Sequence, residues 1–155
     1  MEDFKKDNFY RAYPGEEYPS YNICSEEEAR LLLEKICEKY SCSFEMPLAL
    51  NSQVIKRSRI LDFCNADDDE FSLEEVFERL SITPNDNIYI SWLRLENVYT
   101  FNFKILCKRW DDIWYPAIDD IELFDDSFSW LIGINHHGYI ILVNHTDPRD
   151  ALAEK

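Results

Sequence analysis

The spacing of apolar residues changes once along this chain, after Pro84, and this change constrains the fold more than any other feature. Before it, apolar residues recur every three or four positions, which is typical of a helix with one buried face. After it, Ile88, Ile90 and Trp92 alternate with other residues, which is typical of a strand. Helices followed by strands predict an α+β fold, with the helices on one face of an antiparallel sheet. Because strands and helices do not alternate, a doubly wound nucleotide-binding sheet is not expected.

Two segments of the first half carry strong helix signals. Ser25 and Glu28 have the spacing of a capping box, in which the two side chains satisfy each other's backbone N–H groups. An apolar stripe follows at helical spacing, so we expect a helix over 25–40. A second capping box begins at Ser72, ahead of a shorter helix over 73–80.

Other segments are less regular. Residues 1–23 mix aromatic residues with two prolines, which predicts a short turn or helix followed by an irregular arm. Residues 51–63 fit a further helix, so that 25–80 is mainly helical. The last ten residues, 146–155, form a polar tail. A chain of 155 residues is expected to form a single domain, 1–155.

The second half, 87–143, predicts an antiparallel sheet of about five strands. Its clearest part is a hairpin with the turn His136-His137-Gly138, in which Gly138 is placed for a positive φ. The expected strands cover residues 88–92, 99–107, 120–124, 130–135 and 139–143.

The formal net charge of −15 restricts the classes of partner. Nucleic acids and anionic membranes both need a positive protein face, so direct binding to either is not expected. Five cysteines without a Cys-x-x-Cys pair do not suggest a disulfide framework, and they predict a reducing cytoplasm. The N-terminus shows no signal peptide, and no segment is apolar enough to span a membrane.

The negative charge is concentrated in two windows. Asp62 to Glu78 holds eight acidic and no basic residues, and Asp111 to Asp126 holds seven acidic and no basic residues. The rest of the chain holds 16 acidic and 16 basic residues, so it is neutral. Two solvated surfaces would account for this pattern, and so would the recognition of a basic partner.

The second window also contains aromatic residues. Trp114 and Tyr115 lie between its Asp-Asp pairs, and Trp110 and Trp130 flank it. Packing in the core is one interpretation of these rings. Exposed aromatic anchors ringed by acids are the other, because aromatic residues dominate interface energetics and acids steer a basic partner.

Catalytic and metal sites are weaker interpretations. A hydrolytic centre would need Asp112 to converge with Asp119 or Asp120 in a cleft. A metal site would use His136, His137 and His145, but neighbouring histidines in a tight turn do not usually face one ion. Neither a metal nor another cofactor is therefore expected, and the chain is not expected to be an enzyme.

Three motifs of the second half carry a resemblance. Trp-x-Asp-Ile-Trp-Tyr-Pro-x-x-Asp-Asp is followed by Ser-x-Ser-Trp-Leu and by His-His-Gly-Tyr-Ile, all within residues 87–143. This pattern resembles the C-terminal half of small bacterial proteins, some of which resemble immunity proteins encoded beside contact-dependent or polymorphic toxins. The resemblance implies a cytoplasmic protein that binds and blocks a cognate toxin, often a basic nuclease. It carries no site residues with it.

The sequence therefore predicts an immunity-type, antitoxin-like protein that binds a basic protein partner. A small-molecule or peptide-binding domain is the first alternative, and a carboxylate-dependent hydrolase is the second. The oligomeric state is not indicated. The residues expected to bind the partner are Asp111, Asp112, Trp114, Tyr115, Asp119, Asp120, Asp125 and Asp126.

Overall fold

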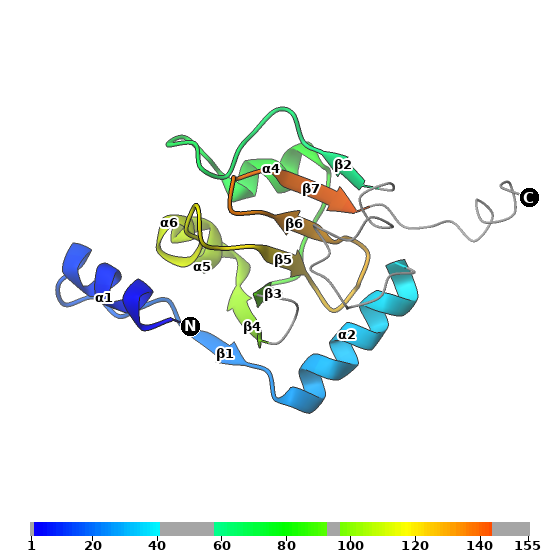
Figure 1. Cartoon of the computed structure of the whole chain (residues 1–155), viewed down its shortest axis with the longest axis horizontal. Coiled ribbons are helices and arrows are strands. Elements are labelled where there is room, and N and C mark those ends of the chain that lie inside the picture. The colour runs from blue at the N-terminus through cyan, green and yellow to red at the C-terminus, as the bar shows by residue number, and fades with distance from the viewer. Residues whose placement is uncertain (1, 41–57, 93–96, 144–155) are drawn as a thin grey trace, which may run out of the picture.

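The computed structural model describes residues 2–40, 58–92 and 97–143, which fold as α+β (Figure 1). Seven strands form one antiparallel sheet in the order β1-β4-β3-β5-β6-β7-β2. The strands are β1 (Tyr21–Ile23), β2 (Ser58–Ile60), β3 (Asn87–Trp92), β4 (Asn97–Asn102), β5 (Ile121–Phe124), β6 (Ile132–Ile134) and β7 (Ile140–Val143). The helices are α1 (Asp3–Ala12), α2 (Glu26–Tyr40), α4 (Leu73–Arg79), α5 (Phe103–Lys108) and α6 (Trp110–Ile113). Within the described residues, no helix is long and apolar enough to cross a membrane.

The elements with the strongest sequence signals are present. At the start of α2, the Ser25 N–H donates to the Glu28 carboxylate at 2.7 Å, and the Glu28 N–H donates to the Ser25 hydroxyl at 3.3 Å. At α4, the Ser72 hydroxyl accepts from the Glu75 N–H at 3.3 Å. Strands β6 and β7 form the expected hairpin, with Gly138 at a φ of +77°. The capping box of α2, the Ser72 N-cap of α4 and the turn glycine are therefore confirmed.

The sheet has two more strands than the five expected, and both come from segments that the sequence suggested were something else. Strand β1 lies in the arm over 1–23, which was expected to be irregular after a short turn or helix, and it pairs with β4. Strand β2 lies in the predicted helix over 51–63 and pairs with β7, so that prediction is wrong for β2. Residues 51–57 and the expected tail, 146–155, lie outside the described residues. Each new strand has three residues, which is too short for an alternating pattern to be recognised.

The long strand expected over 99–107 changes to helix α5 halfway. Asn102 causes the change, because its side-chain oxygen accepts the backbone N–H groups of Lys104 at 3.1 Å and Ile105 at 3.3 Å. This is an N-cap, which satisfies the first free donors of a helix. Leu106 then faces the core at helical spacing. The prediction of a strand after Asn102 is therefore wrong.

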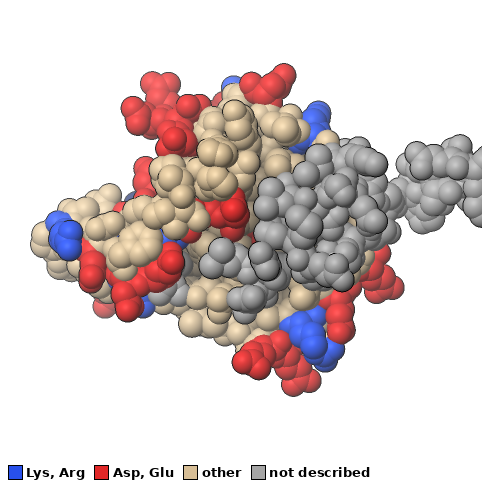
Figure 2. Space-filling view, viewed as in Figure 1, with Lys and Arg blue, Asp and Glu red and all other residues tan. Residues whose placement is uncertain are grey.

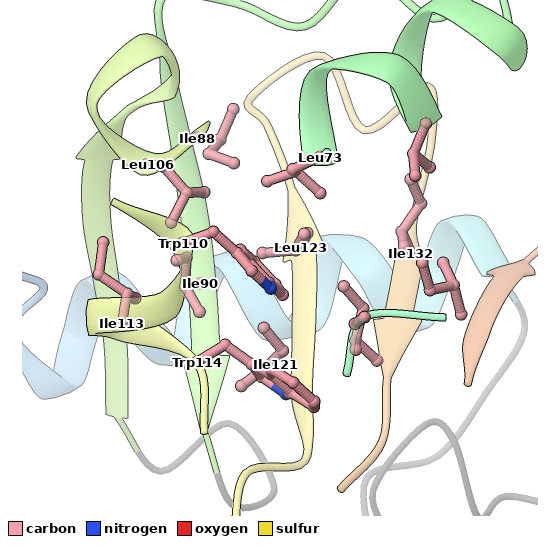
Figure 3. Packing of buried hydrophobic residues seen from close by; sticks show 14 of the residues in the cluster. Leu73, Ile88, Ile90, Leu106, Trp110, Ile113, Trp114, Ile121, Leu123 and Ile132 are labelled. Carbon is pink, nitrogen blue, oxygen red and sulfur yellow. The ribbon is translucent and has the colours of Figure 1, made fainter. Parts of the chain in front are cut away.

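Helices cover both faces of the sheet, and not one face as expected. Helices α4, α5 and α6 lie in front of the sheet in Figure 3, and α2 crosses behind it. The front cluster joins Leu106 to strand residues such as Ile90 and Leu123. The back cluster joins Ile36 of α2 to Phe124. The physical reason is that β5 is buried at all four positions, so each of its faces needs an apolar cover.

Candidate functional site

The acidic stretch from Asp111 to Asp126 lies partly in the interior. Its two end residues are exposed, but three of its seven acids are buried, and Asp119 and Asp125 are only 2% and 1% exposed. A buried carboxylate needs donors that replace water, because an unpaired charge in an apolar interior is costly. The contacts of these two residues show where those donors come from.

Asp125 organises the loop between β5 and β6. One carboxylate oxygen accepts the Ser127 N–H at 3.0 Å, and the other accepts the Trp130 indole N–H at 3.0 Å and the Asn85 N–H at 3.1 Å. Two donors from this loop and one from Asn85, 40 residues away in sequence, therefore converge on one buried side chain. Asp125 holds this loop together and is not accessible to a partner.

Asp119 has a similar role at the opposite end of β5. It accepts from the Lys5 ammonium at 2.5 Å, the Tyr115 N–H at 2.7 Å and the Trp92 indole at 3.2 Å. Lys5 is 1% exposed and also donates to the Ile113 carbonyl at 3.0 Å. Burial lowers the pKa of Lys5, and the neighbouring Asp119 opposes that shift. The pair fastens α1 to the body of the protein.

The three tryptophans of this region belong to the core. Trp110, Trp114 and Trp130 are 4%, 2% and 3% exposed. The rings of Trp110 and Trp114 stack 5.7 Å apart between the helices and the sheet (Figure 3). Trp130 meets Phe77 of α4 edge-to-face at 4.9 Å. The interpretation of Trp114 as an exposed anchor is therefore corrected, because its ring is needed to fill the front cluster.

Three other residues of the expected partner-binding set are half-buried, namely Asp112, Tyr115 and Asp120. Asp112 lies 3.7 Å from the guanidinium of Arg109, and burial raises the pKa of its carboxyl group. Asp120 accepts the backbone N–H of His136 at 2.9 Å. With three of the eight residues buried, the set does not form one exposed surface as the sequence suggested.

The other acidic window has the exposure that this one lacks. All eight of its acids are exposed, and Figure 2 shows acidic side chains gathered where the loop between β2 and α4 projects. We call this segment, residues 62–78, the acidic face. The negative charge of this segment is evident in the sequence, but all the predicted partner-binding residues lie in the other acidic window. The run Asp67-Asp68-Asp69-Glu70 was a usable signal, because Asp and Glu are rarely buried without a partner. The eight acids are Asp62, Asp67, Asp68, Asp69, Glu70, Glu74, Glu75 and Glu78.

The loop of the acidic face is fastened to the turn between β6 and β7. The Asn65 side chain donates to the His137 carbonyl at 3.1 Å and accepts the Asp67 N–H at 2.8 Å. The Ala66 N–H donates to the Gly138 carbonyl at 2.9 Å. These bonds place the exposed acids beside the hairpin turn, although the two segments are about 70 residues apart in sequence.

A broad concavity of about 620 Å³ lies where the loop and the turn meet. We call it the concave surface, and it is lined by Asp67, Pro116, Ala117, His136, His137 and Tyr139. Tyr139 is 51% exposed, and Ile118 beside the lining is 52% exposed. Ala117 has a φ of +65°, which is rare for a residue with a Cβ. An acid, exposed apolar side chains and a strained turn therefore occur together.

The alternatives of metal binding and hydrolysis find little support. Within the described residues, no three potential ligands come together to hold a metal ion, and His145 lies outside those residues. His136 is held by Asp120 through its ring Nδ1 at 2.9 Å. Both oxygens of Asp119 already accept from donors, which leaves it poorly placed to act as a general base.

Comparison of the chain with protein-family models, with curated proteins and with solved structures gives no match. The function is therefore inferred from the residues and the geometry described above.

Proposed function

We propose that this chain is a cytoplasmic immunity-type protein that binds and neutralises a basic protein partner through the acidic face and the adjoining concave surface. The observation that carries the proposal is the exposure of all eight acids in residues 62–78, beside a concavity with exposed apolar side chains. The resemblance of the second half to immunity proteins implies that the partner is a toxin, and a nuclease is a suitable basic candidate.

Charge explains how the partner would approach. A concentrated negative surface attracts a positive protein over about 10 Å at 0.1 M salt and raises the association rate. The acidic face lacks basic residues up to Glu78, so this attraction is not cancelled within the segment. Arg79 directly follows, but it forms an ion pair with Glu75 at 2.6 Å. The field of the face is therefore negative overall.

Apolar contact would hold the complex once it forms. The ring of Tyr139 and the side chain of Ile118 are about half exposed, at the concave surface and directly beside it. Apolar anchors of this kind account for much of the binding energy at protein interfaces. They replace Trp114, which the sequence suggested for this role. Asp120 stays in the proposed surface because its side chain is partly accessible and is bonded to His136, which lines the concave surface. Asp111 and Asp126 are exposed and would contribute only to the surrounding field.

The proposal is tested by measuring binding to a candidate basic protein from a neighbouring gene. Asp67→Lys/Asp68→Lys should raise its dissociation constant by about tenfold or more, because two attractive charges become repulsive. Glu27→Lys/Glu38→Lys is the matched control, since it makes the same charge change on exposed residues of α2. Equal weakening by both variants, or no weakening by the first, would contradict binding at the acidic face. Calorimetry gives both constants, and circular dichroism verifies folding.

A further inference from the structure

A second, smaller cavity lies between the start of α1, the paired ends of β3 and β4, and the segment 118–120. Its volume is about 220 Å³, below the roughly 300–1,000 Å³ of sites for drug-sized ligands. It can therefore hold one side chain or a comparably small group. Trp92 and Tyr99 supply aromatic walls, and their rings meet edge-to-face at 5.2 Å.

The charged groups that line this cavity do not balance. The Lys5 ammonium lies 2.5 Å from Asp119 and 3.9 Å from Glu2, so its single positive charge faces two carboxylates. Glu2 and Asp120 also line the cavity, and both have access to solvent, with side chains 54% and 27% exposed. The described lining residues therefore carry a net negative charge at the mouth of the cavity, which favours a cationic occupant.

The aromatic walls favour the same kind of occupant. The face of an indole or phenol ring attracts a cation within about 6 Å of its centroid. Lys5 already uses this attraction, because its ammonium lies 5.1 Å from the centre of the Trp92 ring. A second cation entering from the mouth would meet the Tyr99 wall and the carboxylates of Glu2 and Asp120. Apolar walls with convergent carboxylates suit a cation that has an apolar stem.

We propose that this cavity binds the guanidinium or ammonium group of one basic side chain of the protein partner. This inference rests on the proposed function and specifies a contact within it. The cavity adjoins the concave surface, because Asp120 lines the cavity while its carboxylate binds His136 of that surface. A partner that covers the concave surface can thus insert a basic side chain here.

Two indole N–H groups make the cavity measurable without the partner. The Trp92 N–H donates to Asp119 beside the cavity, and the Trp130 N–H donates to Asp125, another buried carboxylate. Titration of the ¹⁵N-labelled full chain with N-acetyl-arginine-methylamide, at constant ionic strength, should shift the Trp92 indole resonance with saturation in roughly the millimolar range. The Trp130 resonance should stay in place. The uncharged analogue N-acetyl-glutamine-methylamide should shift neither.

A pair of variants then assigns the effect to the cavity. Glu2→Gln/Asp120→Asn should raise the dissociation constant about threefold to tenfold, whereas Glu27→Gln/Glu38→Gln, on exposed residues of α2 outside the acidic face, should leave it unchanged. Absence of a Trp92 shift, equal shifts at Trp130, or equal weakening by both variants would overturn the inference. Binding of n-butylguanidinium but not of the capped arginine would also overturn it, since the site would then serve a free small cation. None of these results depends on finding the partner, so failure here is distinct from failure of the proposed function.

Discussion

At the scale of single residues, the Asp-Asp pairs show how adjacent identical side chains acquire opposite roles. Asp119 and Asp125 are buried acceptors, whereas Asp120 is half-buried and Asp126 is exposed. In the two pairs on either side of β5, one member of each pair therefore turns inward. An inward carboxylate persists only because indole and backbone N–H groups replace its water. Some of the aspartates in residues 111–126 therefore serve to hold the fold together and not to bind a partner.

Gly138 belongs to the same scale and yields a prediction. A Cβ at this position would lie 1.8 Å from the side-chain oxygen of Asn65 and 2.8 Å from the Asp67 nitrogen. Gly138→Ala should therefore cost about 2–3 kcal/mol of unfolding free energy, because a left-handed conformation is strained and the bonds of Asn65 are disturbed. Gly15→Ala is the matched control, since Gly15 has a φ of +91° but nothing within 4 Å of the added atom.

Urea unfolding measures both variants. The control should lose only the conformational part, about 1 kcal/mol, and the difference between the two variants reports the contact between loop and turn. Equal losses would show that Asn65 does not hold the loop against the hairpin.

At the scale of elements, helices α2 and α4 and the β6–β7 hairpin could be predicted, because their signals lie within a few residues of sequence. Strands β1 and β2 could not, since a three-residue edge strand is specified by its partner and not by its own pattern. The burial of Asp119 was also beyond local reasoning, because its main counterion, Lys5, is 114 residues away. Helix coverage of both sheet faces depends on the same long-range packing.

Helix α5 provides the prediction at this scale. Asn102→Ala removes the oxygen that accepts the first two N–H groups of the helix, and should cost about 1 kcal/mol, within the roughly 0.5–2 kcal/mol measured for such caps. Asn102→Asp keeps an acceptor and should retain most of the stability. Thermal unfolding of the three proteins tests this, and a loss in the aspartate variant equal to that in alanine would show that the cap is unimportant.

At the scale of the whole molecule, the dominant property is a formal charge of −15, much of it on exposed residues. Like charges on a folded surface repel one another, and salt screens that repulsion. The melting temperature of the isolated protein should therefore rise as sodium chloride increases from about 20 to about 300 mM, where the Debye length falls several-fold. A steady fall over that range would mean that attractive pairs such as Lys5–Asp119 outweigh the repulsion.

The uneven distribution of that charge supports the central claim, which is that the acidic face guides a basic partner onto the concave surface. Steering and holding are separable, because peripheral charges act mainly on association and buried anchors act mainly on dissociation. Tyr139→Ala should then mainly speed dissociation, since it removes a half-exposed ring without changing the charge.

The most direct test is the association rate of wild type, Asp67→Lys/Asp68→Lys and Tyr139→Ala with the basic partner, measured by stopped flow across a series of salt concentrations. We predict that the wild-type rate falls steeply with salt, and that the charge-reversed variant associates at least about tenfold more slowly at low salt with a flatter salt dependence. Tyr139→Ala should keep the wild-type association rate. An association rate that is indifferent both to salt and to the two reversed aspartates would contradict the claim and leave the acidic face as a solvated surface.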